Sequence, residues 1–368
     1  PGGRPGRFRL LAGAAGPPAA EPARANPSTV QLQQRRTTRA GIPGPSAAVT
    51  CPKKGMHMIL TVTMNPSIDT RYTVDHLVID DVNRVTAAKT AGGKGLNVSR
   101  VLVQLGDDVV ATGLLGGHSG AYLGDLMDAD GIPHRFTPIA GESRTCIALL
   151  HDGNQTELLE SGPTVSAEEL GAFMDNYRDL VAGASCVTLS GSLPKGVPAG
   201  CYADLVRIAR EAGVPVLLDT SGAALDAALA SDVKPTLVKP NLTEVNGLLG
   251  TSFSPDDLDE LRATLAADER FAGIDWVVVS MGAAGSVAFH GGRTLRARAP
   301  RIDAVNATGS GDSTIAGFAH AIAAGSDAEE VLRCGNTCGT LNAMDPQTGH
   351  LVMESWDEIH GAVEISEL

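Results

Sequence analysis

The stretch Val305–Gly317 reads V-N-A-T-G-S-G-D-S-T-I-A-G and joins two glycines and a carboxylate to a helical pattern over Ser313–Ala324. Glycine lets the backbone approach a ligand closely, and the start of a helix offers unpaired N–H groups and a partial positive charge. Gly309 and Gly311 therefore predict an anion site suited to a phosphate in transfer. On this spacing Asp312 is equally well a base that takes a proton from an attacking hydroxyl or a helix N-cap.

A second glycine-rich stretch, A-G-G-K-G-L-N-V-S over 91–99, leads into an amphipathic helix that reaches Leu105. It is not a Walker A loop, because Lys94 is followed by Gly95 rather than Ser or Thr. Its glycines still let N–H groups approach a polar ligand, although such turns are common. Upstream, Asp69 is expected in a short polar turn after a buried strand, where it either accepts bonds from sugar hydroxyls or caps its own backbone.

Two further turns have residues suited to a nucleotide. Lys239-Pro240-Asn241, with Glu244 one helical turn later, offers a cation, an amide and a carboxylate for phosphates and Mg²⁺. The tight turn Ser280–Gly285 can run close to a flat ligand or a phosphate, but it is equally typical of an ordinary hairpin.

Short half-polar strands at Arg71–Asp75 and Val82–Lys89 indicate a small flap beside the main domain. Arg144–Leu150 and Gln155–Glu160 are expected to form a hairpin around Asp152-Gly153-Asn154. Arg84 and Arg144 together would suit a phosphate, because guanidinium forks match phosphate oxygens. Each arginine alone is more typical of a solvated surface charge.

The rest of the body alternates between strand and helix patterns, which predicts a parallel sheet covered by helices on both faces. Ser190, Asp219, Lys239 and Ser280 end successive strands, so these polar residues line the edge where ligands bind. We expect strands at Met58–Met64, Val109–Gly113, Cys186–Ser190, Val214–Asp219, Leu237–Lys239 and Trp276–Ser280, and helices at Gly120–Asp130, Ala167–Ala182, Ala199–Ala212, Ala223–Ala230, Leu242–Leu249 and Pro255–Ala267.

Composition limits the classes of function. The 368 residues, 43% of them hydrophobic, suffice for one large α/β domain or two small ones. No apolar run is long enough to span a bilayer, and six scattered cysteines predict buried free thiols. Cys334 and Cys338 are four residues apart, but no nearby Cys or His pair completes a metal site.

Charge separates residues 1–57 from the remainder. They hold nine Lys or Arg against one acid, a net charge of +8, so residues 58–368 carry −21 of the total of −13. The acidic body argues against nucleic-acid binding, and the Pro, Gly, Ala and Arg content of the tail predicts disorder. The tail is interpreted as a transit peptide, a basic interaction arm or sequence ahead of the true start. The absence of Met before Met56 favours the last interpretation.

The segments A-G-G-K-G-L-N-V-S-R (91–100) and N-A-T-G-S-G-D-S-T (306–314) resemble, in order and spacing, the two signatures of the ribokinase-like (PfkB) carbohydrate kinases. The resemblance covers Met58 to about the C-terminus. It implies a three-layer α/β/α fold with a mostly parallel central sheet and a small β-lid from segments near 70–90 and 144–162. It also implies ATP and Mg²⁺ dependence, a cytoplasmic location, small-molecule substrates and a homodimer formed through the lid.

The resemblance also implies residue roles. Asp312 is the base for a primary hydroxyl of the sugar, and the backbone of Thr308–Asp312, with Gly309, Ser310 and Gly311, is the anion hole. The remaining roles divide by ligand: Asp69, Gly92, Gly93 and Asn97 hold sugar hydroxyls, Arg84, Arg144 and Lys94 hold the sugar's phosphate, Lys239, Asn241, Ser280, Gly282, Gly285, Thr308 and Asn336 contact ATP, and Glu244 lies near Mg²⁺.

Within the family, six further stretches are most similar to the tagatose-6-phosphate kinase group: 80–85, 89–98, 146–151, 155–163, 190–196 and 342–349. Residues 141–146 and 306–309 depart from that group, with Thr145 in place of an Asn. The expected reaction is ATP-dependent conversion of D-tagatose 6-phosphate to D-tagatose 1,6-bisphosphate. The alternatives are a 1- or 6-phosphofructokinase, a non-catalytic sugar-phosphate sensor, and a nucleic-acid binder acting through the tail.

Overall fold

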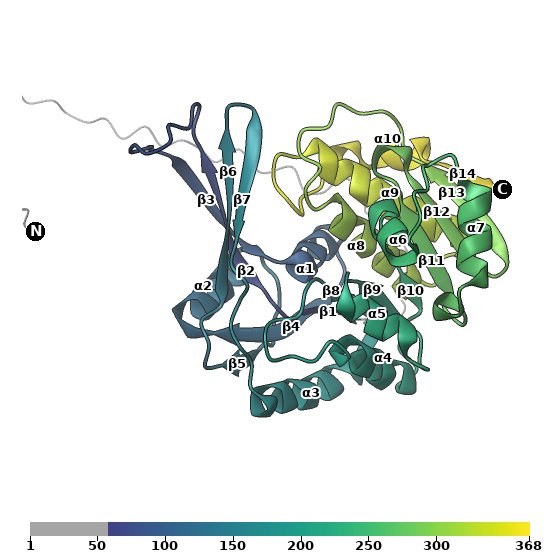
Figure 1. Ribbon diagram of the computed structural model, residues 1–368, viewed down its shortest axis with the longest axis horizontal. Helices are drawn as coiled ribbons and strands as arrows, with labels where there is room; N and C mark the ends of the chain where they lie inside the picture. Colours follow the sequence, from purple (N-terminus) through teal and green to yellow (C-terminus); the bar gives the residue numbers. More distant parts are fainter. Residues whose placement is uncertain (1–57) are drawn as a thin grey trace, which may run out of the picture. The chain divides into compact units, whose positions relative to one another are not determined.

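The computed structural model describes residues 58–368, and its centre is a ten-stranded sheet (Figure 1). The strand order is β14-β13-β12-β11-β10-β9-β8-β1-β4-β5, parallel from β11 to β5 and antiparallel from β11 to β14. The strands are β1 Met58–Thr63, β4 Val109–Gly116, β5 Thr137–Ile139, β8 Ala184–Ser190, β9 Val216–Asp219, β10 Leu237–Val238, β11 Trp276–Ser280, β12 Ser286–His290, β13 Arg293–Arg298 and β14 Glu364–Glu367.

Helices cover both faces of this sheet. The covering helices are α1 Lys94–Leu105, α2 Gly117–Ala129, α3 Ala167–Val181, α4 Cys201–Glu211, α5 Ala223–Ala230, α6 Leu242–Leu249, α7 Leu258–Ala267, α8 Ser310–Ala324, α9 Ala328–Met344 and α10 Trp356–Ala362. Side chains alternate across a strand, so Leu60 and Val62 of β1 join the core under α3 to α7, whereas Ile59 joins the core under α1, α8, α9 and α10. The result is three layers around two large apolar cores, with a smaller third cluster where α2 packs against β4 and the base of a second sheet.

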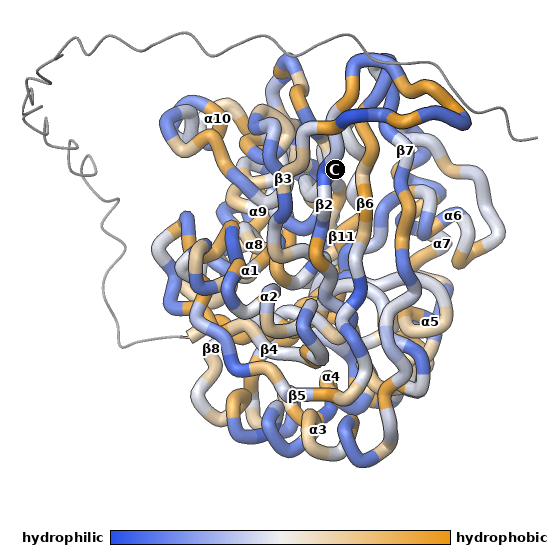
Figure 2. Tube along the Cα trace, turned by 90° about the vertical axis from the view of Figure 1, so that its left-hand side faces the viewer, coloured by the Kyte–Doolittle hydropathy of each residue, from blue (hydrophilic) through white to orange (hydrophobic). Residues whose placement is uncertain are grey.

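A second sheet of four strands extends away from the large one (Figure 1). Its order is β3-β2-β6-β7, from β2 Ser67–Thr73, β3 Thr86–Gly92, β6 Arg144–His151 and β7 Asn154–Leu159. Every residue of β7 is exposed, as are the first four of β3. Apolar residues nevertheless occur along these strands and at their tip (Figure 2). We refer to this sheet as the lid.

Several predicted boundaries were wrong in ways that bear on the site. The strand predicted from Arg71 begins at Ser67, so Asp69 lies in a lid strand rather than in a turn. Helix α8 begins at Ser310 rather than at Ser313, which places Asp312 inside its first turn. The segment from Val82 to Val85 precedes β3 and is not a strand.

The predicted free thiols are confirmed for the five cysteines in the described part of the chain, all of which are buried. Cys51 and the predicted disordered tail, residues 1–57, lie outside the described residues. Between residues 58 and 368, no helix is both long and apolar enough to cross a membrane.

Candidate active site

The start of helix α8 forms a tight, glycine-dependent turn. Its N-cap is Gly309, which has φ 83°, a conformation that side chains other than glycine rarely adopt. A Cβ on Gly309 would also lie 2.6 Å from the Thr348 methyl group. Because Gly309 is the cap, the N-cap interpretation of Asp312 is wrong. The carboxylate of Asp312 is free for another task.

Backbone N–H groups at this turn point to an anion site. Within residues 58–368, the N–H groups of Gly309, Gly311 and Asp312 have no protein acceptor, whereas two predicted members of the anion hole do. Thr308 N–H donates to a side-chain oxygen two residues earlier, and Ser310 N–H donates to a carbonyl three residues earlier. The hole available to a phosphoryl group is therefore narrower than predicted, with three donors at the positive end of α8.

Asn342 of α9 holds the turn in place, although the sequence analysis did not assign it a functional role. It is fully buried. Its Nδ2 donates to Thr308 O at 2.9 Å and to Ser310 Oγ at 3.2 Å, while its Oδ1 accepts from Ser313 Oγ and Gly349 N–H. One amide thus fixes both ends of the anion-binding turn. Its position in the 342–349 stretch was the available signal.

Asp312 is buried and has a specific partner. The Nδ2 of Asn97 on α1 donates to its Oδ2 at 2.8 Å. Burial raises the pKa of Asp312, with the carboxylate of Asp219 raising it further, to about 6. The Asn97 hydrogen bond and the ammonium groups of Lys94 and Lys239 oppose this shift. A carboxylate with this pKa is ionised at neutral pH and is still basic enough to accept a proton.

Asp219, at the end of β9, links two lysines beside Asp312. Its oxygens lie 3.6 Å from Lys94 Nζ and 3.6 Å from Lys239 Nζ, and its side chain is only 3% exposed. Asp219 is the main cause of the raised pKa of Lys94. The sequence placed Asp219 at the ligand-binding edge of the sheet but gave it no role, since a strand-end position does not reveal partners from other elements.

Both lysines face the transfer region. Lys239 Nζ would lie 3.4 Å from a Cβ on Gly311, so its ammonium is next to the free N–H groups. Lys94 is close enough to Asp312 and Glu244 for both carboxylates to raise its pKa. The structure therefore places Lys94 with the predicted ATP ligands, not with the predicted clamp for the sugar's phosphate.

Arg100 orients Asn97. Its Nη1 donates to Asn97 Oδ1 at 3.2 Å, so that the amide Nδ2 points at Asp312. Arg100 is itself held by Asp130, with Nε to Oδ2 at 2.9 Å, and by the carbonyl of Ala91. A chain of hydrogen bonds thus runs from Asp130 to Asp312. Arg100 belongs to the 91–100 signature, yet its spacing did not identify it as a functional residue.

Asp69 and Gly92 are diagonal neighbours in the adjacent lid strands β2 and β3. A Cβ on Gly92 would overlap the Asp69 carboxyl group, so glycine is what makes room for this acid. Ser67 Oγ donates to Asp69 Oδ1 at 2.6 Å. Burial raises the pKa of Asp69, and the positive charges of Arg144 and Arg100 partly offset that rise. The carboxylate is placed to accept hydroxyl groups at the base of the lid.

The two arginines of the predicted phosphate clamp differ in their surroundings. Arg144 is half-buried at the base of the lid, where Nε donates to Asn65 O and Nη1 to Glu160 O, each at 3.1 Å. These bonds fix the direction of the guanidinium near Asp69. Arg84 is exposed in the segment that joins β2 to β3. The structure therefore brings Arg144, but not Arg84, together with the other predicted residues.

The predicted nucleotide residues lie at two turns. Asn241 and Glu244 form a reciprocal capping box at the start of α6, which uses Asn241 Oδ1 and Glu244 Oε2. Glu244 keeps its second oxygen, which fits the carboxylate and water ligands that Mg²⁺ prefers. Ser280–Gly285 joins β11 to β12 through one turn of 3₁₀ helix. Gly282 and Gly285 both have positive φ in this turn.

Asn336 supports that turn from behind. Its Nδ2 donates to Ser286 Oγ at 2.9 Å and to Leu332 O at 2.8 Å. Both amide hydrogens are therefore engaged within the protein. Asn336 thus fixes the β12 end of the turn, and its contact with ATP stays a prediction.

A parallel α/β sheet, a lid, and a carboxylate beside an anion-binding helix start are the arrangement of a phosphotransferase. The chain belongs to the pfkB family of carbohydrate kinases, whose family model matches residues 63–355. Kinases of this family use ATP. The predicted ribokinase-like fold is confirmed.

Solved structures with the same fold include phosphofructokinases. A Staphylococcus aureus protein provisionally described as a phosphofructokinase is 30% identical, with a TM-score of 0.72 over 84% of this chain and 99% of that one. A Thermotoga maritima protein provisionally described as a 1-phosphofructokinase is 25% identical, with a TM-score of 0.75 over 85% and 100%. Escherichia coli phosphofructokinase-2 shares the fold at 24% identity, with a TM-score of 0.77 over 83% and 99%.

Proposed function

We propose that this kinase transfers the γ-phosphoryl group of ATP to D-tagatose 6-phosphate and so forms D-tagatose 1,6-bisphosphate. The observation that carries a kinase reaction is the Asp312 carboxylate, buried, oriented by Asn97 and adjacent to three free N–H groups at the start of α8. The observation that supports tagatose 6-phosphate is the similarity of six stretches to that group.

The reaction follows from the placement of these groups. Asp312 takes the proton of the sugar's primary hydroxyl as its oxygen attacks phosphorus, and the bond to the leaving ADP breaks. The N–H groups of Gly309 and Gly311 and the ammonium of Lys239 stabilise the charge on the transferred group. Glu244 would hold the Mg²⁺ that accompanies ATP and neutralises its phosphates.

The sugar lies under the lid in this proposal. Asp69 accepts its hydroxyl groups, and Arg144 pairs with the phosphate already on the sugar. A site that clamps a phosphate through a guanidinium strongly disfavours an unphosphorylated sugar, because the charge of the arginine would be left without an anionic partner. It discriminates much less between two ketohexose phosphates that differ at one carbon.

Fructose 6-phosphate and fructose 1-phosphate are therefore the alternative substrates. The structural neighbours described as phosphofructokinases favour this second reading, and the E. coli neighbour has been solved with fructose 6-phosphate. Thr145, on β6 beside Arg144, stands where the tagatose group has Asn.

The test is a comparison of kcat/KM for the full chain with ATP and Mg²⁺ on tagatose 6-phosphate, fructose 6-phosphate and fructose 1-phosphate. We expect the highest value for tagatose 6-phosphate and no measurable turnover with unphosphorylated tagatose. A higher kcat/KM for either fructose phosphate would make that sugar the proposed substrate and leave the proposed mechanism unchanged. A different outcome would show a sensor and not a kinase. In that case the Asp312→Ala variant binds ATP and the sugar phosphate, and the unmodified chain turns over none of the three substrates.

A further inference from the structure

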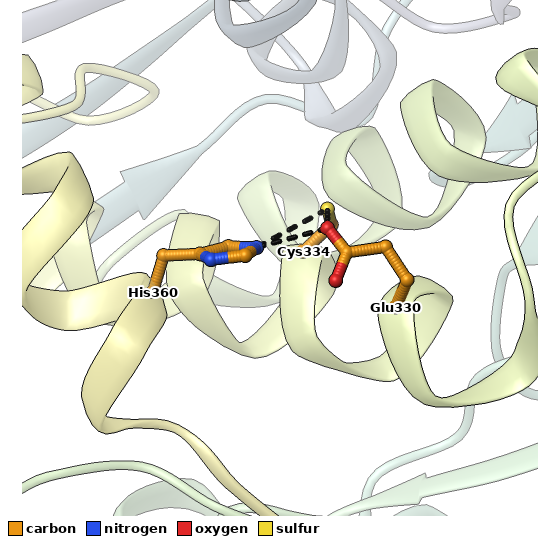
Figure 3. A group of neighbouring side chains, drawn as sticks. All are labelled: Glu330, Cys334 and His360. Carbon is orange, nitrogen blue, oxygen red and sulfur yellow. Dashed lines mark hydrogen bonds and ion pairs between the residues drawn. The ribbon is translucent and has the colours of Figure 1, made fainter. Parts of the chain in front are cut away.

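Three side chains of types that can ligate a metal meet at the junction of α9 and α10, and the phosphoryl-transfer proposal uses none of them. Glu330 and Cys334 lie one turn apart on α9, and His360 comes from α10 (Figure 3). One ligand atom from each lies within 4.8 Å of the others. His360 follows Cys334 by 26 residues. This separation is too long for the sequence pattern around Cys334 to have indicated the site.

The spacing of the three atoms fits a tetrahedral ion. Glu330 Oε1 lies 2.9 Å from His360 Nε2 and 3.2 Å from Cys334 Sγ, and Sγ lies 3.9 Å from Nε2. Ligand atoms on tetrahedral Zn²⁺ are separated by about 3.3–3.7 Å, given bonds of roughly 2.0–2.3 Å. Movements of a few tenths of an ångström would therefore admit the ion.

The pattern of contacts does not suit a thiol activated for catalysis. In such an arrangement one imidazole nitrogen faces the thiol and the other faces the carboxylate. Here the same nitrogen, Nε2 of His360, faces both Cys334 Sγ and Glu330 Oε1 (Figure 3). The three atoms converge on one point instead of forming a relay.

Neighbouring groups hold the ligands in this orientation. Arg333 Nε lies 3.6 Å from Glu330 Oε2, which leaves Oε1 directed at the cluster. Trp356 stacks on the His360 ring with 5.7 Å between centroids. Such outer partners orient the ligands of metal sites. Arg333 also donates to the carbonyls of His360 and Val363, which joins α10 to α9.

Burial is graded across the cluster. Cys334 is 4% exposed, whereas the side chains of His360 and Glu330 are 26% and 38% exposed. An ion could thus enter from solvent, be bound by three protein ligands and keep a water as its fourth ligand. A thiolate and an imidazole select a borderline-soft cation over Mg²⁺.

We propose that Glu330, Cys334 and His360 form a binding site for a thiophilic divalent cation, with Zn²⁺ as the cation to test. On binding, the Cys334 S–H bond breaks and its proton leaves to solvent. The electron pair left on the thiolate sulfur then binds the metal. The ion would fasten α10 to α9, the helix that also carries Asn342 and Asn336.

The experiment is a titration of the full, chelator-treated chain with Co²⁺, and then Zn²⁺, in the absence of nucleotide. We expect one Co²⁺ to bind with a thiolate-to-metal charge-transfer band that Zn²⁺ abolishes. Loss of a residue that only supports a ligand weakens metal sites roughly 10–100-fold. Cys334 is a direct ligand in this proposal, so Cys334→Ser should abolish the band and weaken Co²⁺ binding by more than about 100-fold. Zn²⁺ should raise the Tm of the unmodified chain but not that of Cys334→Ser.

Two further variants keep the result interpretable. His360→Asn changes a partly exposed side chain and should weaken binding in the same way without disturbing the core. Cys338→Ala removes the thiol one turn further along α9, which is fully buried and outside the cluster, and should leave the band unchanged. The proposal is overturned if Co²⁺ gives no thiolate band, or if the band survives in Cys334→Ser.

Discussion

At the scale of single residues, the site depends on one carboxylate kept in a demanding environment. Asp312 is surrounded by protein, next to a second acid, and oriented by a single amide. Its stability as an anion comes from Asn97, Lys94 and Lys239, while burial acts against it. Function and folding therefore make opposite demands on this position.

Asp312→Asn should remove activity and add stability. General bases contribute about 10²–10⁴-fold, so we expect kcat to fall by that factor with ATP binding retained. In the unmodified chain kcat should decline below about pH 6 as Asp312 is protonated. A kcat that stays flat from pH 8 to pH 5 would contradict the role of Asp312 as base.

The sign of the stability effect is fixed by the direction of the pKa shift. The pKa of Asp312 is higher in the folded chain than the value of 3.8 for the free group, so the folded state loses stability as pH rises from about 4 to 6. Asp312→Asn should thus be more stable at pH 8, on the order of 2 kcal/mol, and this difference should vanish near pH 4. Urea denaturation at both pH values measures it.

Arg100 is a positioning residue, and its substitution should be felt through Asn97. Arg100→Lys keeps the charge but loses the fork that holds both Asn97 and Asp130. We expect kcat to fall about 10-fold with little change in KM, and the acid limb of kcat to move to higher pH as the Asn97 bond to Asp312 weakens. In an Asn97→Ala background the same substitution should add almost nothing. Equal losses in both backgrounds would show a merely structural role.

At the scale of elements, the site depends on glycines where two strands or a strand and a helix come close. Gly92 in β3 leaves room for Asp69 in β2, and Gly309 allows the turn that opens α8. One of these glycines lies in the lid and the other precedes a helix that covers the large sheet, and both border the candidate site. Local sequence patterns marked the glycines, and only the pairing of the strands shows what each one accommodates.

Gly92→Ala should damage sugar binding selectively. The new methyl group would overlap the Asp69 carboxylate, which has to move. We expect KM for the sugar phosphate to rise about 10-fold or more, while KM for ATP changes little. Gly171→Ala is the matched control, because its methyl group would enter open space on α3. Unchanged KM for the sugar in Gly92→Ala would remove Asp69 from the sugar site.

At the scale of the whole molecule, the lid has an apolar surface that nothing in the described chain covers. Of the ten large hydrophobic residues exposed in residues 58–368, six belong to the lid sheet or to the segment that joins its strands β2 and β3: Val78, Ile79, Val82, Val85, Leu158 and Leu159. A surface of this kind is typical of an interface, which supports the proposal of a homodimer formed through the lid.

Leu159→Glu should therefore weaken the dimer. Leu159 is 63% exposed at the end of β7, and a charge there would have to be buried in an interface. Light scattering during size exclusion should give a dimer for the unmodified chain and a monomer for the variant. Met353→Glu, exposed but away from the lid, should remain dimeric. An unmodified chain that is monomeric at micromolar concentration would contradict the proposal.

The sequence alone was sufficient to predict the layered fold, and it marked many residues of the candidate site. Alternating strand and helix patterns were sufficient for the parallel sheet, because period and length are local properties. The two glycine-rich stretches were sufficient for the family, and for Asp312 and Asn97. Their spacing also indicated an anion site at the start of a helix.

Tertiary structure decided what these residues contact. Asp219, Arg100 and Asn342 lie on three different elements, and no spacing along the chain reveals that they hold Lys239, Asn97 and the α8 turn. Spacing along the chain also does not reveal that His360 lies beside Cys334, or that Lys94 pairs with Asp219 instead of lying beside Arg144. Motifs follow from short-range chemistry, whereas partners are set by packing between segments up to hundreds of residues apart.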